Sequence, residues 1–535
     1  MTSCAEVFAQ AAKVQGVLRV FGHPGGEIVD LIDACERAGV EFVLTGHEAT
    51  AAFMAGTVGR LTGRPGLCMA TLGPGACNLL LGVACAYLDR DPLVAVSART
   101  SSDRESWSNK QNLPLNELFA PVTKRSYGLD GRNTEAIVTE AFQTAVAAPR
   151  APVYLTVPSD IAAGEDRADG ARPPSREPAA VDDRSFDRIS SALSRARRPV
   201  AVVGTALDRL ADSPAVRRFL SATGLPVVTL PQGKGIADED SELFIGAVGT
   251  AVGDAALIAD LLMRSDCLLG IGFDPVELGQ SWHRGAPIHS LAAGATGFGD
   301  YAPLAECTGP LGELLGRLAD DYVGESDWSA AELTHVREAV RAAMIPKHKS
   351  GAAGLSPYHV TRLLHEALPE DAVLATDVGA HKVMVTQAWR ATRPDGFLVT
   401  NGLSAMGYGL PAALAAASLH PDRAVVAIVG DGGFGMTVQE LETARRLGVA
   451  PLIVVFCDRS LSIIKVAQDE RQLPHRGVDF EAVDWARVAE GFGVQGRTAR
   501  RLSDVEAAVA DWRAQRAPMV LAVEIDDSLY AGLTY

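Results

Sequence analysis

Short apolar runs recur along the whole chain. They are separated by longer segments whose apolar residues recur at helical spacing. A period near 3.6 is typical of a helix with one buried face, whereas a continuous apolar run of about four to eight residues is typical of a strand buried on both faces. Buried strands are predicted within residues 41–46, 66–73, 92–98, 151–158, 197–204, 225–230, 266–272, 372–379, 424–432, 451–458 and 519–525.

This alternation of strands and helices predicts the fold class, because parallel strands covered by helices on both faces form doubly wound α/β sheets. Two stretches break the alternation, the charged and Pro-rich segment 164–188 and the polar segment 323–356, and we interpret both as joints. We therefore expect three doubly wound α/β domains, over residues 1–165, 185–325 and 350–535. Ligands of such domains bind beyond the carboxyl ends of the strands. We therefore expect the functional residues in the loops that follow the apolar runs.

Composition and charge exclude several classes of protein. The chain has 535 residues and a formal charge of −16, which would repel nucleic acid and anionic membranes, so neither is expected as a partner. No apolar run reaches the roughly 18 residues that span a bilayer, and the N-terminus lacks a signal-peptide layout, so a cytoplasmic protein is expected. Eight cysteines form no CxxC pair; Cys68, Cys77 and Cys85 lie in apolar stretches and are expected to be small core residues.

A glycine-rich turn containing an acidic residue ends the run at 424–432. The backbone N–H groups of such a turn can hold an anion, and Asp431 within it can bind a divalent cation that neutralises the anion. The next run ends at Asp458, 27 residues later, so that two carboxylates at the ends of neighbouring strands can reach one cation. Taken alone, an Asp-Gly pair is more often an ordinary turn. The second carboxylate favours a Mg²⁺ site.

The Gly-Asp-Gly turn followed by Asp458 resembles the cofactor motif of thiamine-diphosphate-dependent enzymes. The resemblance implies that the protein uses thiamine diphosphate and Mg²⁺, with the ion held by Asp431, Asp458 and the main-chain oxygen of Ser460. Most members of the family carry an Asn-Asn pair where this chain has Cys457 and Asp458. This is a departure, but an Asp at the second position still offers Mg²⁺ an oxygen ligand.

Two further stretches of the last domain match the family. TDVGAHK, at 376–382, resembles the turn that contacts the diphosphate, and NGLSAMGYGLPAAL, at 401–414, resembles the segment beneath the thiazolium ring. In that segment Met406 would brace the bent cofactor, although a lone methionine is more often a core residue. The resemblance assigns cofactor contacts to Gly379, His381, Ser404, Met406, Gly432 and Gly433.

In the first domain, Glu48 follows the run at 41–46 and opens an Ala-rich helical stretch. An acidic residue at a helix N-terminus is commonly only a partner of the helix dipole. Pieces typical of the family surround it in order: FGHPGG at 21–26, TLGPGACN at 71–78 and AYLDRDPLVAVSA at 86–98. The resemblance implies that Glu48 hydrogen-bonds to the aminopyrimidine and favours the imino tautomer, whose nitrogen can take the proton of the thiazolium ring. It also places Gly25 and Gly26 beside the cofactor.

The resemblance covers nearly the whole chain and is closest to acetolactate synthases of the catabolic, flavin-independent kind. It rests on LFAPVTKRS at 118–126, GDGGFGMTVQELETARRL at 430–447 and GIGFDPVELGQSW at 270–282. The last of these differs from the pattern of flavin-binding relatives, so no FAD is expected. In this family the activating glutamate reaches a cofactor held by another subunit, which implies a homodimer at least and a homotetramer as the expected assembly.

Candidate substrate contacts come from the same resemblance. Gln111 matches a glutamine that faces the reaction centre, and the helical stretch 461–472 should line the substrate pocket. At Ala467 anabolic relatives have Trp and catabolic ones Gln, so a small residue either enlarges the pocket or removes a polar contact. A cation such as Lys465 is more often an exposed helical residue than a ligand for a substrate carboxylate. Gln111 is a catalytic candidate, and the substrate candidates are His23, Ile464, Lys465 and Ala467.

These observations favour a carboligase that decarboxylates a pyruvate-like 2-oxo acid and transfers the acyl carbanion equivalent to a second carbonyl compound. A decarboxylase or an aldehyde lyase of the same family remains an alternative, as does a catalytically silent regulatory paralogue. The presence of Glu48, Asp431 and Asp458 disfavours the silent paralogue. A dinucleotide-dependent dehydrogenase is disfavoured because FGHPGGE, at 21–27, is not the GxGxxG fingerprint.

Overall fold

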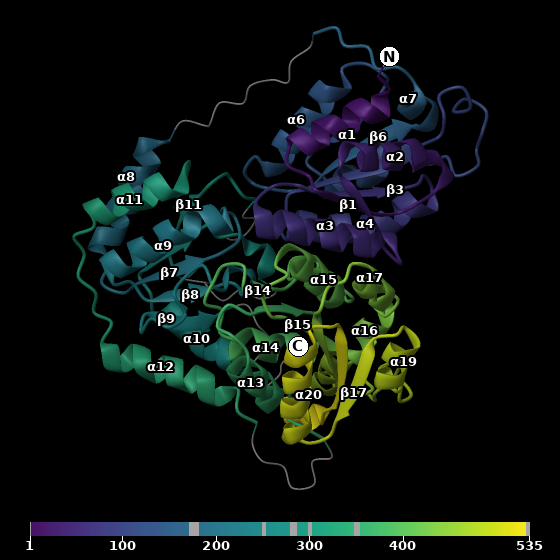
Figure 1. Cartoon of the computed structure of the whole chain (residues 1–535). Coiled ribbons are helices and arrows are strands. Elements are labelled where there is room, and N and C mark those ends of the chain that lie inside the picture. The colour runs from purple at the N-terminus through teal and green to yellow at the C-terminus, as the bar shows by residue number, and fades with distance from the viewer. Residues whose placement is uncertain are drawn as a thin grey trace. The chain divides into compact units, whose positions relative to one another are not determined.

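The computed structural model describes residues 2–170, 181–248, 253–278, 286–297, 302–346 and 354–530 (Figure 1). The chain forms two compact units, Met1–Glu177 with Leu414–Leu419, and Pro178–Ala413 with His420–Tyr535. The described residues contain three six-stranded sheets, one in the first unit and two in the second, and all their strand pairs are parallel. The expected fold class, three doubly wound α/β sheets, is confirmed. Within these residues no helix is both long and apolar enough to cross a membrane.

The sheet of the first unit has the strand order β2-β1-β3-β4-β6-β5. Its strands are β1 (Arg19–His23), β2 (Glu41–Leu44), β3 (Gly66–Ala70), β4 (Leu93–Arg99), β5 (Ser126–Gly128) and β6 (Val153–Pro158). Its helices are α1 (Cys4–Val14), η1 (Gly26–Ile28), α2 (Val29–Ala38), α3 (Glu48–Thr62), α4 (Pro74–Leu88), α5 (Leu115–Phe119), η2 (Ala120–Val122), α6 (Thr134–Val146) and α7 (Ser159–Ala163).

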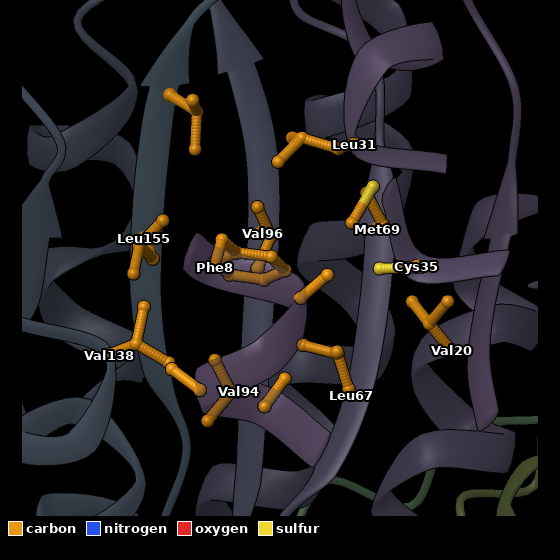
Figure 2. Packing of buried hydrophobic residues seen from close by; sticks show 14 of the residues in the cluster. Phe8, Val20, Leu31, Cys35, Leu67, Met69, Val94, Val96, Val138 and Leu155 are labelled. Carbon is orange, nitrogen blue, oxygen red and sulfur yellow. The ribbon is translucent and has the colours of Figure 1, made fainter. Parts of the chain in front are cut away.

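The core of this unit lies between one face of the sheet and helices α1, α2 and α6. Phe8 of α1 is fully buried against the middle of the sheet, beside Val94 and Val96 of β4 and Leu155 of β6 (Figure 2). On the other face of the sheet, β1, β3 and β4 pack against α3 and α4, because successive side chains of a strand point to opposite faces. Helices α3 and α4 also pack against each other. Burial on both faces explains why these strands are continuous apolar runs.

The expectation for one cysteine is wrong. Cys68 and Cys85 are buried as predicted, but Cys77 is exposed. Along α4 the residues Ala76 and Leu79 face inward, and Cys77, one position after Ala76, is rotated by about 100° to another side of the helix. An apolar neighbourhood in the sequence does not reveal which side of a helix a residue occupies.

The first sheet of the second unit has the order β12-β11-β10-β7-β8-β9. Its strands are β7 (Pro199–Val203), β8 (Val227–Thr229), β9 (Phe244–Ala247), β10 (Cys267–Ile271), β11 (Ile288–Ala292) and β12 (Ala305–Thr308). Its helices are α8 (Asp183–Arg195), α9 (Arg209–Thr223), η3 (Pro231–Gly233), α10 (Gly253–Met263), η4 (Pro275–Glu277), α11 (Leu311–Asp321) and α12 (Ala330–Ala343).

Helix α12 lies within the segment 323–356 that the sequence suggested as a joint. Its residues Leu333, Val336 and Val340 are buried with those of α10 and β9 in one apolar core. The described part of the segment is therefore a packed helix of the central domain, because its few apolar residues all fall on one face. Residues 171–180 of the other expected joint, 164–188, lie outside the described residues.

The second sheet of this unit has the order β14-β13-β15-β16-β18-β17. Its strands are β13 (Val373–Thr376), β14 (Phe397–Leu398), β15 (Val425–Gly430), β16 (Leu452–Cys457), β17 (Gln495–Ala499) and β18 (Met519–Glu524). Its helices are α13 (Pro357–Ala367), α14 (Ala380–Ala388), α15 (Gly409–Leu419), α16 (Asp431–Thr437), α17 (Glu440–Arg446), α18 (Ser462–Glu470), α19 (Trp485–Gly491), α20 (Leu502–Gln515) and η6 (Asp527–Leu529). β15 and β16 are neighbours, and Gly430 pairs with Phe456, so both strands end at the same edge.

Hydrogen bonds join the two sheets of the second unit. The Gln387 side chain of α14 makes two hydrogen bonds to the backbone of Ala247 in β9. It accepts from the N–H at 3.3 Å and donates to the carbonyl at 2.6 Å. Asn401 donates to the carbonyl of Glu277 at 3.1 Å. The loop before α15, which resembles the cofactor segment, is thus attached to the central domain.

Candidate active site

Asp431 and Asp458 meet at the carboxyl edge of the last sheet, as their positions after β15 and β16 predicted. Asp431 is 3% exposed, and its two oxygens accept from the N–H groups of Gly432 and Arg459, both at 2.9 Å. Asp458 accepts from the Ser460 N–H at 3.2 Å and from the Ser462 hydroxyl at 2.5 Å. These bonds fix both carboxylates before any ligand arrives.

The electrostatics of this pair suit a divalent cation. Burial raises the pKa of Asp431 to about 7, and the nearby charge of Asp458 adds to the effect. Burial likewise raises the pKa of Asp458 to about 6. Two desolvated carboxylates side by side disfavour ionisation, and a divalent cation between them would reverse this.

The donor set of the site also fits Mg²⁺. The described residues hold no cluster of three or more His, Cys, Asp or Glu side chains suited to a metal. An ion bound by Asp431 and Asp458 would therefore complete its shell with main-chain oxygens, water and phosphate oxygens. That is the usual arrangement for Mg²⁺, which seldom has an all-protein cage.

His381 lies in the first turn of α14 and is 3% exposed. Its Nε2 atom has no hydrogen-bond partner among the described residues. Burial lowers the pKa of His381 to about 3, so the ring is neutral at pH 7. Gly379, just before the helix, has a φ of 154° and provides no side-chain cap for the helix N–H groups. A buried ring nitrogen beside uncapped N–H groups is consistent with a bound polar group such as a diphosphate.

The buried carboxylate of Asp377, which was not among the predicted site residues, holds the Met406 segment. Asp377 is 1% exposed and accepts from the N–H of Gly407 at 2.9 and 3.0 Å, and from those of Tyr408 at 3.3 Å and Val378 at 2.8 Å. The Met406 methyl group lies 3.5 Å from the position that a Cβ at Gly432 would occupy. Asp377 lies within the quoted stretch TDVGAHK, but its three bonding partners are visible only in the fold.

Ten of the twelve candidate residues of this unit line one cavity of about 180 Å³. Tyr530, which belongs to none of the predicted motifs, also lines it and is buried. Two glycines in the wall cannot be replaced freely, since a Cβ at Gly433 would lie 2.0 Å from an Asp377 oxygen and one at Gly432 3.1 Å from Leu461. The predicted residues that line the cavity are Gly379, His381, Ser404, Met406, Asp431, Gly432, Gly433, Asp458, Ser460 and Ile464.

Two predicted substrate residues on α18 are placed differently. Lys465 makes ion pairs with Asp479 at 2.7 Å and with Asp527 at 3.3 Å, so its charge is already neutralised by this unit. Ala467 is buried within the unit at 7% exposure. Neither residue is part of the lining of the 180 Å³ cavity.

In the first unit, Glu48 is the first residue of α3 and is 8% exposed. The ring of His47 caps the helix by accepting from the Ala49 N–H at 3.1 Å. The Glu48 Oε2 atom accepts from the Asn78 side chain at 2.9 Å. Asn78 closes the quoted stretch TLGPGACN but was not selected from the sequence, because its partner is 30 residues away.

The glycines expected beside the cofactor differ in their freedom. A Cβ at Gly25 would lie 2.4 Å from Thr71, whereas one at Gly26 would meet nothing within 4 Å. His23 bonds through Nδ1 to the Thr45 carbonyl at 2.8 Å. Gln111 is exposed, has a φ of 59°, and lies against Gly73. These residues and Glu48 belong to the first unit, whereas Asp431 and Asp458 belong to the second.

Family models match all three parts of the chain. The N-terminal TPP binding domain of thiamine pyrophosphate enzymes matches residues 2–119, the central domain residues 186–292, and the C-terminal TPP binding domain residues 377–523. Thiamine pyrophosphate is another name for thiamine diphosphate.

Relatives with known names cover nearly the full length. The chain is 30% identical to the acetolactate synthase of Bacillus subtilis (strain 168), over 98% of this chain and 93% of that protein. It is 28% identical to the catabolic acetolactate synthase of Raoultella terrigena and 30% identical to the large subunit of acetolactate synthase isozyme 2 of Escherichia coli (strain K12), in both cases over 98% of this chain and 95% of the relative. The chain therefore belongs to the thiamine-diphosphate-dependent enzyme family and is similar to its acetolactate synthases.

Proposed function

We propose that this protein is a carboligase that removes CO₂ from pyruvate or a similar 2-oxo acid and joins the remaining acyl unit to the carbonyl carbon of a second molecule. With pyruvate in both roles the product is 2-acetolactate. The observation that carries the proposal is the similarity to acetolactate synthases over 98% of the chain. The buried pair of Asp431 and Asp458, and Glu48 at the start of α3, are the groups that this chemistry needs.

Thiamine diphosphate, when bound, supplies an acidic ring carbon and a sink for the electron pair that decarboxylation releases. Asp431, Asp458 and the carbonyl of Ser460 would hold Mg²⁺ against the diphosphate. His381, neutral because burial lowers its pKa to about 3, would offer its unpartnered nitrogen to the same group. Met406, held in place through Asp377, would support the bent cofactor from below.

Glu48 would hydrogen-bond to the aminopyrimidine ring and so direct a proton away from the reacting carbon. In the thiamine-diphosphate-dependent family the matching glutamate reaches a cofactor held by another subunit, and we extend this arrangement to Glu48. The outer side of α4 supports such an assembly, since Leu81 there is 47% exposed and Cys77 is exposed as well. We therefore propose a homodimer at least, with a homotetramer as the expected assembly.

The proposed enzyme works without FAD. In an open α/β sheet a nucleotide binds at the point where the strand order reverses, here between β7 and β10. The loops after these strands bond to each other, with the Ala206 N–H donating to the Gly272 carbonyl at 2.8 Å. Leu207, 5% exposed, fills the gap between them. The closure of these two loops on each other supports the proposal that no flavin binds at the switch point.

A second candidate within the family is a decarboxylase or lyase, or a ligase with another acceptor. Ala467 is the observation that favours it, because catabolic acetolactate synthases carry the longer Gln at the matching position. A shorter side chain removes a polar contact that helps to select the acceptor.

The test is to incubate the purified protein with thiamine diphosphate, Mg²⁺ and pyruvate and to follow CO₂ and products by mass spectrometry. Cofactor-dependent 2-acetolactate that disappears in Glu48→Gln supports the carboligase. Acetaldehyde as the main product would instead establish the decarboxylase. No turnover of pyruvate or of a panel of 2-oxo acids, despite bound cofactor, would overturn the proposal.

A further inference from the structure

Asn78 Nδ2 donates a hydrogen bond to Glu48 Oε2 at 2.9 Å. Among the described residues, it is the side chain that bonds to this carboxylate. Glu48 is 8% exposed, so water competes poorly for this bond. We propose that Asn78 is a positioning residue for the reaction: its hydrogen bond fixes the Glu48 carboxylate through Oε2 and leaves Oε1 available to the aminopyrimidine. This inference rests on the proposed role of Glu48.

The other oxygen of Glu48 faces a position without a side chain. A Cβ at Gly75 would lie 3.3 Å from Oε1 and 2.9 Å from the Thr71 methyl group. Gly75 and Asn78 are both in the first turns of α4. One helix therefore donates to Oε2 and keeps Oε1 clear, which gives the two oxygens different roles.

The relative position of α3 and α4 is fixed at their other ends. Arg60 of α3 makes ion pairs with Asp91 at 2.7 Å and with Asp89, the C-cap of α4, at 3.3 Å. The Arg60 side chain is 2% exposed. A buried, charge-assisted clamp of this kind allows little sliding between the helices. Glu48 and Asn78, at the opposite ends of the same helices, are thereby held at bonding distance.

Other titratable side chains near this end of the unit are engaged elsewhere. His47 accepts from the Ala49 N–H, His23 bonds to the Thr45 carbonyl, and Glu27 accepts from the Thr71 hydroxyl at 2.6 Å. Cys77 is exposed on α4. Among the described residues, Asn78 is thus the side chain whose loss removes a stabilising hydrogen bond from the Glu48 anion.

The test compares Asn78→Ala and Asn78→Asp with Asn116→Asp, which makes the same chemical change on the exposed surface of α5. The first readout is the exchange of the acidic ring proton of bound thiamine diphosphate in D₂O, followed against pH by NMR. It needs no 2-oxo acid, so it succeeds or fails independently of the proposed substrate. The second is the dissociation constant of thiamine diphosphate in the presence of Mg²⁺, and the third is the melting temperature.

In Asn78→Ala the acid limb of the exchange rate is expected to move to higher pH by about one unit, because a hydrogen bond to a charged group is lost. Asn78→Asp should move it further, since two adjacent carboxylates resist joint ionisation. Asn116→Asp should leave the limb in place. The dissociation constant and melting temperature of Asn78→Ala should stay near those of the parent protein.

A uniform loss of exchange at every pH, with the acid limb unmoved, would overturn the inference, because a purely structural role predicts that pattern. So would an unchanged limb together with unchanged rates. Failure to convert any 2-oxo acid would contradict the proposed function but not this inference, provided that the exchange still responds as expected.

Discussion

The sheet of the first unit and the last sheet of the second unit have the same strand order, β2-β1-β3-β4-β6-β5 and β14-β13-β15-β16-β18-β17. Each counts 2-1-3-4-6-5 from its own first strand. The loops after equivalent strands nevertheless differ in chemistry. After the second strand one domain has Glu48 and the other has the segment containing Met406. After the third strand one has the stretch ending at Asn78 and the other has Asp431.

The comparison separates what the fold supplies from what the loops supply. Both sheets bring the ends of neighbouring strands to one edge, and this places candidate residues together in each case. In the last domain the edge holds two carboxylates whose pKa values burial raises to about 7 and about 6. In the first unit it holds Glu48, whose carboxylate is bonded to the Asn78 amide. Under the proposed function, one frame would serve anion and metal binding in the last domain and proton transfer in the first.

The largest expected effect tests whether Glu48 and the pair of Asp431 and Asp458 have different roles. Glu48→Gln is expected to lower kcat by about 1000-fold, within the range for loss of an acid–base group. The dissociation constants of thiamine diphosphate and Mg²⁺ should change little, because the last domain holds both. Steady-state kinetics and calorimetry on the same preparation provide the measurement. A loss of cofactor affinity as large as the loss of kcat would mean that Glu48 is chiefly a binding residue.

Asp431→Asn should show the opposite pattern. Replacing one of two carboxylate ligands is expected to weaken Mg²⁺-dependent binding of thiamine diphosphate by about 100-fold. Titration calorimetry at several Mg²⁺ concentrations measures this, with Asp422→Asn, an exposed change in the same domain, as the matched control. If the variant keeps its affinity, the assignment of the metal site to this edge is wrong.

Asp377→Ala tests whether the last domain needs a preformed cofactor support. The substitution leaves the buried N–H groups of Gly407 and Tyr408 without their acceptor, which is expected to cost about 2 kcal/mol of stability. Displacement of Met406 should weaken cofactor binding about 10-fold. Urea unfolding and calorimetry measure the two effects, and Asp371→Ala, an exposed residue before β13, is the control. An unchanged affinity would remove Asp377 from the cofactor support.

The effect that is smallest at neutral pH concerns acid stability. The folded pKa of His381 is about 3, below its ordinary value of 6.5. The unfolded chain therefore binds a proton that the folded chain does not, and stability falls as pH drops below about 6.5. His381→Phe should remove up to about 1.4 kcal/mol per pH unit of this loss between pH 6 and 4. Urea unfolding followed by tryptophan fluorescence measures it; identical pH profiles for parent and variant would show that His381 is accessible to protons in the fold.

Several parts of the site could be predicted because their residues directly follow apolar strands. The separation of Asp431 and Asp458 corresponds to a helix and a strand, and two neighbouring parallel strands then bring them together without further information. The expectation for Cys77 was wrong because burial depends on the side of α4, which a short apolar stretch does not specify. Lys465 illustrates the same limit, since its partners Asp479 and Asp527 lie in other segments of the chain.

The sequence by itself determined the alternation of strands and helices, the parallel sheets and the residues at the strand ends, because these depend on local periodicity and on the short-range chemistry of turns. Only the tertiary structure decided that Asn78 bonds to Glu48, that Asp377 holds the Met406 segment and that Tyr530 lines the cavity. These contacts join residues that are about 30 or more positions apart. Their formation depends on how helices pack on the sheets, and no local pattern records that packing.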